Sequence, residues 1–269
     1  MMRQLSVKAD DDWVNRDHSP TPNGETIQIK NEKEFTMTQQ QGIVKGDTLL
    51  KIGSTGLIIG AILMVIGSIW PASVDLGGAV VMQKEFGEQA VVLQACALLM
   101  MFGNWGVMVG IAGIYRSITA RGEAASGAAM ARLGFYFLLM GTTIWTIGHS
   151  LNVSYPAAIV NWQAAPADGK DAAYIAVAAI PGFGRGLFPM EVIVLWLAFA
   201  LLGIGMVHSS VYPRWLGWGG LILGIAGVLL GIIQTFTGRE SSFILFGILL
   251  YLTILWWLVT GIWIARKAW

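Results

Sequence analysis

Five polar side chains that could do chemistry lie in the outer ends of apolar runs: Gln94, His149, Asn152, Glu191 and Gln234. An imidazole and a carboxylate can form an ionisable pair that binds a polar ligand or relays a proton, and amides supply further hydrogen bonds. Polar groups are costly inside a bilayer, so each one is a candidate for function. We expect a polar ligand pocket open to the outer face of a membrane. The alternative, ordinary polar groups near the lipid headgroups, stays open.

Other chemistries have weaker support in the sequence. We predict no metal site, because zinc needs three or four ligands and only His149 and Glu191 are plausible ones. No bound cofactor is predicted either, although a haem, pigment or quinone held against deep tryptophans stays open. The run Pro181-Gly-Phe-Gly-Arg-Gly is interpreted as a flexible connector, because no strand precedes it as a phosphate-binding loop would require. No catalytic residue is predicted, and the sequence favours a protein that is not an enzyme.

The elements that position these residues are membrane-spanning helices. Among the 269 residues, 55% are hydrophobic and only 12% are charged. A helix needs about 20 mostly apolar residues to cross a bilayer, and six runs qualify. They cover residues 50–70, 91–115, 131–152, 187–208, 213–236 and 242–265. The sequence therefore predicts an all-α membrane protein, a bundle of six transmembrane helices.

Glycines recur with heptad spacing in four of the six runs. The fifth run carries them on one helix face, at Gly217, Gly220, Gly224, Gly227 and Gly231. Small residues let helix backbones approach closely in lipid, so we expect these faces to be helix interfaces. The fourth and sixth runs lack such stripes. We therefore predict that they are peripheral and expose their bulky residues to lipid or to a partner: Trp196, Phe199, Trp256 and Trp257.

The distribution of lysine and arginine predicts the orientation. Basic residues are more frequent on the side that holds both ends of the six-span region, so the N- and C-termini are expected in the cytoplasm. Residues 1–49 are predicted to form a mostly disordered cytoplasmic tail, ahead of a transmembrane domain over 50–269. Residues 153–186 are predicted to be a long outer loop with a short interfacial helix. A net charge of +1 argues against nucleic acid as a partner.

The segment Val211-Tyr-Pro-Arg-Trp-Leu-Gly-Trp-Gly-Gly-Leu-Ile-Leu-Gly resembles a signature of bacterial six-span membrane proteins of unknown function. In those proteins a Pro-x-Trp-Leu-Gly-Trp turn opens the fifth helix. The resemblance implies a fold and a multi-pass location in the cell (inner) membrane, but no activity. Only the motif over 212–224 is specific, and the long N-terminal tail departs from the pattern.

Three functions are compatible with the sequence. The first expectation is a non-catalytic accessory or assembly subunit, which associates with the lipid bilayer, with other membrane subunits or with itself. The second is a binder or transporter of a small-molecule or lipid-like ligand that uses the outer polar pocket. The third is a membrane redox subunit that holds a pigment, quinone or haem.

Overall fold

The computed structural model describes residues 47–69, 89–120, 127–238 and 242–269. Every described residue belongs to one compact unit, Gly42–Trp269. The predicted tail, residues 1–49, lies outside the described residues except for residues 47–49.

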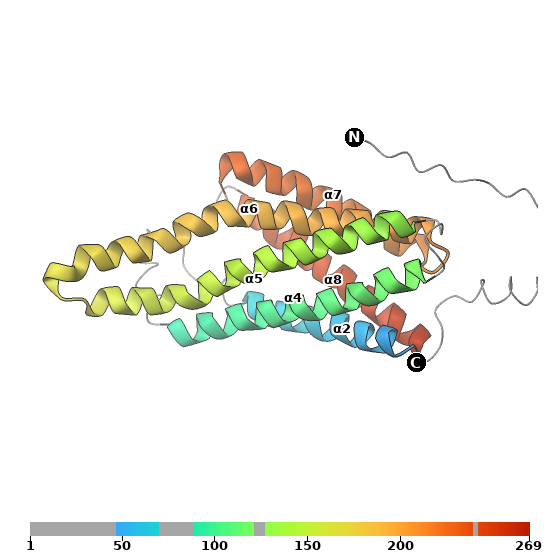
Figure 1. The fold of residues 1–269 in the computed structure, drawn as a ribbon, viewed down its shortest axis with the longest axis horizontal. Helices are drawn as coiled ribbons and strands as arrows, with labels where there is room; N and C mark the ends of the chain where they lie inside the picture. Colours follow the sequence, from blue (N-terminus) through green and yellow to red (C-terminus); the bar gives the residue numbers. More distant parts are fainter. Residues whose placement is uncertain (1–46, 70–88, 121–126, 239–241) are drawn as a thin grey trace, which may run out of the picture. The chain divides into compact units, whose positions relative to one another are not determined.

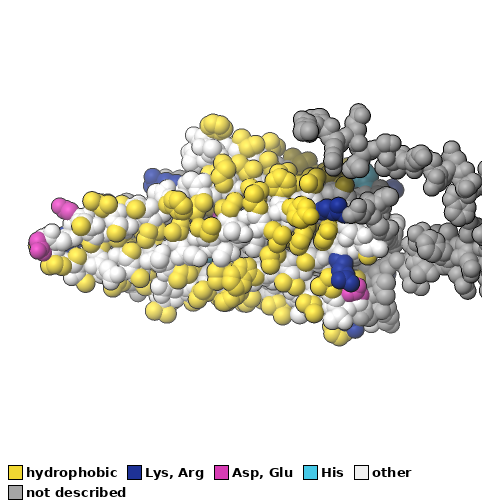
Figure 2. Space-filling model, viewed as in Figure 1, with side chains coloured by type: hydrophobic (Ala, Val, Ile, Leu, Met, Phe, Trp, Pro, Cys, Tyr) yellow, Lys and Arg dark blue, Asp and Glu magenta, His cyan; other side chains and the backbone are white. Residues whose placement is uncertain are grey.

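Six helices in the described part of the chain are long and apolar enough to cross a membrane. They are α2 (Thr48–Ile69), α4 (Ala90–Thr119), α5 (Ala128–Ala164), α6 (Lys170–His208), α7 (Arg214–Thr237) and α8 (Phe243–Ala268) (Figure 1). The described residues contain no strand, so the predicted all-helical, six-span architecture is confirmed at this level. Hydrophobic side chains cover much of the face seen in Figure 2, as lipid contact requires.

The predicted loop over 153–186 is wrong, because α5 and α6 continue through it as the two arms of a helical hairpin. Only the short helix η1 (Ala167–Gly169) separates them. Ile159 and Val177 are fully buried in the arms, and the rings of Trp162 and Tyr174 lie 5.4 Å apart. These contacts, together with the alanine-rich start of α6, favour helix over loop.

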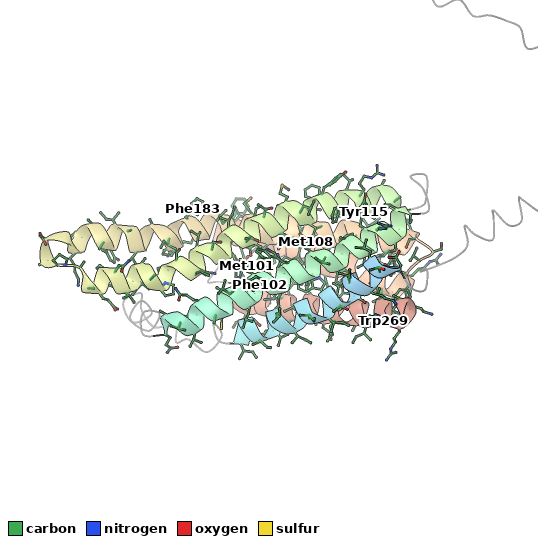
Figure 3. The ribbon with its side chains drawn as sticks, turned by 60° about the horizontal axis from the view of Figure 1, so that its bottom comes forward. Met101, Phe102, Met108, Tyr115, Phe183 and Trp269 are labelled. Atoms are coloured by element: carbon green, nitrogen blue, oxygen red, sulfur yellow. The ribbon has the colours of Figure 1, made fainter. Side chains whose placement is uncertain are left out.

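The two long helices exceed the thickness of a membrane. At about 1.5 Å per residue, the 37 residues of α5 and the 39 of α6 span roughly 55–60 Å, whereas the hydrocarbon core is about 30 Å thick. Pro181 and Pro189 both lie inside α6. The glycine-rich run 181–186, interpreted from the sequence as a flexible connector, is therefore helical. Phe183, labelled in Figure 3, is on the α6 arm.

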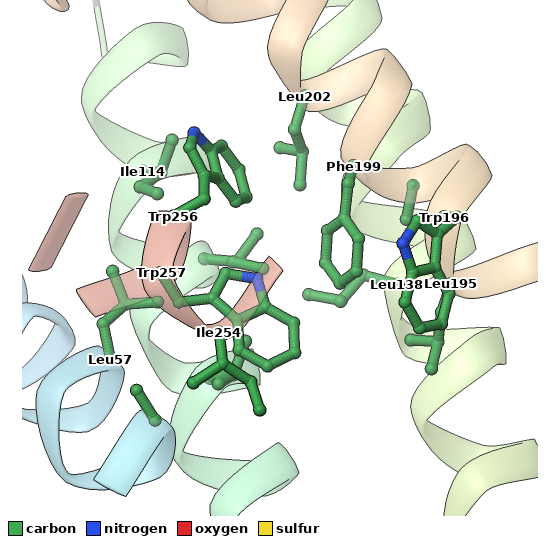
Figure 4. Packing of buried hydrophobic residues seen from close by; sticks show 14 of the residues in the cluster. Leu57, Ile114, Leu138, Leu195, Trp196, Phe199, Leu202, Ile254, Trp256 and Trp257 are labelled. Atoms are coloured by element: carbon green, nitrogen blue, oxygen red, sulfur yellow. The ribbon is translucent and has the colours of Figure 1, made fainter. Parts of the chain in front are cut away.

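The prediction that the fourth and sixth spans are peripheral is also wrong. α6 is the most deeply buried of the six helices and packs against both α5 and α7. Trp196 and Phe199 are each 1% exposed, and Trp256 and Trp257 are buried with them in one core (Figure 4). The physical reason is that the glycines of α7 have no side chains, so bulky α6 side chains fill the space beside them. A Cβ atom at Gly227 would collide with the Trp196 ring.

A second close contact joins α2 to α4. A Cβ atom built at Gly56 would lie 2.7 Å from the carbonyl oxygen of Gly106, and one built at Gly106 would lie 2.8 Å from that of Gly56. The two backbones therefore touch without intervening side chains. α8 also packs against α2, and a Cβ at Gly261 would lie 2.9 Å from Leu57 Cβ.

Candidate functional site

The structure brings Glu191 and the segment around His149 together where α6 meets α5. Glu191 is 4% exposed and His149 is 8% exposed. A Cβ atom at Gly148, the residue before His149, would lie 3.0 Å from Glu191 Oε2. The absence of a side chain at Gly148 therefore lets the carboxylate reach the α5 backbone. The pair of helices holds an acid and an imidazole at one height, within the apolar bundle.

The orientation of the His149 ring is fixed by Trp145, one turn earlier in α5. The two rings stack with centroids 4.6 Å apart and planes 15° apart. His149 Nδ1 lies 3.0 Å from the Trp145 carbonyl oxygen. Because a carbonyl only accepts hydrogen bonds, this geometry assigns the Nδ1 proton and leaves Nε2 as the second functional atom of the ring.

Trp145 is a site residue that the pattern of polar residues in the sequence does not predict. Its role as a stacking partner could have been found from the spacing of four residues, which places 145 and 149 on one helix face. From the sequence, Trp145 is only one of several tryptophans deep inside apolar runs. An indole in that position is more often a packing residue than part of a site.

The other three predicted pocket residues are Gln94, Asn152 and Gln234. Gln94 on α4 donates from Nε2 to the Val153 carbonyl of α5 at 2.9 Å, and Asn152 is exposed. Gln234 on α7 is 1% exposed, and neither of its amide atoms has a hydrogen-bond partner among the described residues.

Gln234 approaches α6 from a different flank than His149 does. It lies one turn beyond Gly231, whose Cβ position faces Ile193 and Pro189 of α6. Glu191 falls between these two residues in sequence, and successive helical residues point about 100° apart. The α5-facing carboxylate and the α7-facing positions are therefore on separate sides of α6.

The segment that resembles the six-span signature begins in the turn between α6 and α7 and continues into α7. Pro213 precedes Arg214, the first residue of α7. Tyr212 is buried, shares a hydrogen bond of 2.7 Å with Ser117 of α4, and packs on the ring of Trp263 at 5.3 Å. Burial raises the pKa of the Tyr212 hydroxyl well above its ordinary value, and the Ser117 hydrogen bond offsets this in part.

Comparison of the chain with protein-family models, with curated proteins and with solved structures gives no match. The resemblance of 211–224 to bacterial six-span proteins therefore stays a prediction. No group of three or more His, Cys, Asp or Glu side chains placed to hold a metal ion occurs within the described ranges.

Proposed function

We propose that this multi-pass membrane protein binds a small polar ligand at the His149–Glu191 pair, in the outer half of the bundle. The observation that supports the proposal is the burial of an acid and an imidazole on facing helices, at the point where Gly148 lets them approach. Ionisable residues inside membrane helices are rare and costly, and they usually serve binding or proton transfer.

The chemistry of the pair narrows the ligand class. A carboxylate accepts hydrogen bonds and attracts cations, while His149 Nε2 can accept a proton or donate one according to its charge state. A ligand with an amine or another hydrogen-bond donor would complement Glu191. The flat ring of Trp145 beneath His149 prevents the imidazole from turning away.

The experiment is a thermal-stability screen of the purified protein against small amines, amino acids and carboxylates. A ligand that binds the native state raises the midpoint of unfolding. Glu191→Gln and His149→Gln should abolish the shift that the wild-type protein shows. Survival of every ligand shift in both variants would refute the proposal.

His208 supplies a matched control for His149. It also lies in a long apolar helix, and its Nδ1 is 2.9 Å from the carbonyl of Ile204, four residues earlier. It is exposed, at the C-terminal end of α6. His208→Gln therefore removes the same kind of local hydrogen bond without touching the proposed site, and it should leave the ligand response unchanged.

A role as an accessory or assembly subunit is the second candidate. The observation that favours it is the α5–α6 hairpin, which is long enough to leave the bilayer and still exposes apolar side chains such as Ile175 and Phe183. Native mass measurement in gentle detergent tests this role. A bare monomer, with neither partner nor second copy, would count against it.

We also infer that the glycine faces serve close helix packing within the chain. The stripe over Gly217–Gly231 supports this: a Cβ at Gly217 would lie 2.6 Å from the Val207 nitrogen of α6, and one at Gly231 would lie 2.7 Å from Ile193 Cγ1. Glycines already occupied by helices of the same chain leave fewer free faces for other subunits, so they favour the ligand-binding proposal over the accessory role.

A further inference from the structure

One contact fixes the register of α4 against α5 near the middle of both helices. Trp105 Nε1 donates a hydrogen bond of 3.0 Å to Thr146 Oγ1, and Trp105 is 38% exposed. The preceding residues on each helix, Asn104 and Trp145, point about 100° away from them. Both are almost fully buried. Asn104 and Trp145 therefore lie at the same height, on the inner side of this contact.

Thr142 completes a group of three on the inner side. It lies one turn from Trp145 on the buried face of α5. Asn104 Nδ2, Trp145 Nε1 and Thr142 Oγ1 are all buried and have no hydrogen-bond partner within the described part of the chain. Buried polar groups are normally paired, so three unpaired groups at one helix contact call for an explanation.

The hydroxyl of Thr142, like that of Thr260 on α8, lacks the local hydrogen bond that most described helical threonines make. Inside an apolar helix a threonine usually donates to the carbonyl of the preceding turn. Seven threonines do so here: Thr55, Thr119, Thr143, Thr146, Thr235, Thr237 and Thr253. Thr142 makes no such bond. Its hydroxyl therefore points to a hydrogen-bond partner other than the carbonyl of the preceding turn.

We propose that Asn104, Thr142 and Trp145 together bind one hydrogen-bond-accepting oxygen inside the membrane. The indole and amide nitrogens only donate, whereas the Thr142 hydroxyl donates or accepts. An internal water can accept from both nitrogens and donate to Thr142. The carbonyl oxygen of a lipid-soluble quinone can accept from two of the three groups. Both sources share this acceptor chemistry, and the apolar surroundings restrict the site to small or lipophilic molecules.

The site is distinct from the His149–Glu191 pair. His149 stacks on the Trp145 ring and bonds to the Trp145 carbonyl, but it does not use the indole N–H. Substitutions at Thr142 and Asn104 leave the acid and the imidazole in place. Failure of one proposal can therefore be separated from failure of the other.

The test compares Thr142→Val with Thr143→Val in detergent, without added ligand. Thr143 is exposed and bonds to its own helix at Leu139, so it supplies the matched control. If Thr142 holds an internal water, Thr142→Val lowers the unfolding midpoint by about 2–4 °C relative to Thr143→Val. Thr142→Ser, which keeps the hydroxyl, should stay close to the wild type even where Thr142→Val does not fold.

A second arm adds menadione as the quinone probe. If the site takes a carbonyl ligand, menadione raises the midpoint of the wild-type and Thr143→Val proteins, and its affinity falls about tenfold in Thr142→Val and Asn104→Leu. The proposal is overturned if Thr142→Val is as stable as Thr143→Val or more stable, while menadione stabilises either no protein or all of them equally. Removal of an unpaired hydroxyl would give that result, because burying such a group is unfavourable.

Discussion

Trp196 occupies the place where a side chain at Gly227 would begin, and this residue-scale contact can be tested directly. Gly227→Ala should destabilise the protein by about 1–3 kcal/mol, because an overpacked interface must shift. Gly247 on α8 is the control, since nothing lies within 4 Å of its Cβ position. Gly247→Ala should be neutral or stabilising by up to about 1 kcal/mol. Equal stability of the two variants, measured by reversible unfolding, would contradict the packing described for α6 and α7.

Tyr212 gives a pH-dependent prediction at the same scale. Burial raises its pKa in the folded protein above the ordinary value of 10.0. Above pH 10 the unfolded chain ionises this tyrosine while the folded chain holds it protonated. Stability therefore declines as pH rises, by about 1.4 kcal/mol per unit from this group.

The measurement compares unfolding midpoints at pH 8 and pH 11. Tyr212→Phe should lose less stability over this interval than the wild type does, because the titrating group is gone. Tyr136→Phe, the same change at an exposed position of α5, should behave as the wild type. An identical alkaline loss in Tyr212→Phe and wild type would show that Tyr212 does not contribute.

At the scale of elements, the α5–α6 hairpin makes a prediction about accessibility. Cys96 is the chain's one cysteine, so Cys96→Ala provides a background for single-cysteine variants. Ala179→Cys on the α6 arm should react with a water-soluble maleimide, because we expect this part of the helix to extend beyond the hydrocarbon core. Leu255→Cys, which is exposed on α8 within a predicted span, should stay unlabelled in the membrane. Protection of Ala179→Cys would place the hairpin inside the bilayer instead.

The hairpin also shows which part of the fold could be predicted. The length of the apolar runs alone identifies all six spans, because any helix needs about 20 mostly apolar residues to cross a bilayer. It says nothing about where a helix ends outside the lipid. Beyond the lipid, burial of residues such as Ile159 and Val177 stabilises the helices. Proline and glycine in this segment favoured a loop, and the packing of the two arms overrides them.

The central position of α6 could not be predicted from glycine spacing for a related reason. A stripe of glycines leaves a groove on a helix surface, and bulky side chains of a neighbouring helix must fill that groove. Leu195 and Trp196 of α6 fill the positions beside Gly141 of α5 and Gly227 of α7. The helix without a stripe is therefore central because its two neighbours have stripes. Pairwise complementarity of this kind appears only when helix contacts are known.

At the scale of the whole molecule, the sequence predicted the height of the candidate site residues better than their direction. Depth along a span follows from counting residues, and His149 and Glu191 do lie at one height. Which side of α6 each neighbour occupies depends on the order of helices around the bundle. Gln234 therefore falls on another flank of α6, and the stacking of Trp145 on His149 emerges only from the structure.

The remaining expectation is that both termini of the bundle lie in the cytoplasm, and the positions of its basic residues support it. Lys51, Arg116, Arg214 and Arg266 lie at ends of α2, α4, α7 and α8. Trp269, beside Lys51 with the ammonium 4.5 Å from its ring centroid, brings the α8 end to the start of α2. Basic residues at one end of a bundle favour the cytoplasmic side.

In the Cys96→Ala background, Ala167→Cys at the hairpin tip should therefore react with an impermeant maleimide in intact cells. Ala268→Cys lies at the opposite end and should react only after the membrane is permeabilised. Because Ala268 is buried, its labelling after permeabilisation is carried out in denaturant. The reverse pattern would invert the topology and place the His149–Glu191 pair in the cytoplasmic half. Its ligand would then have to be an intracellular one.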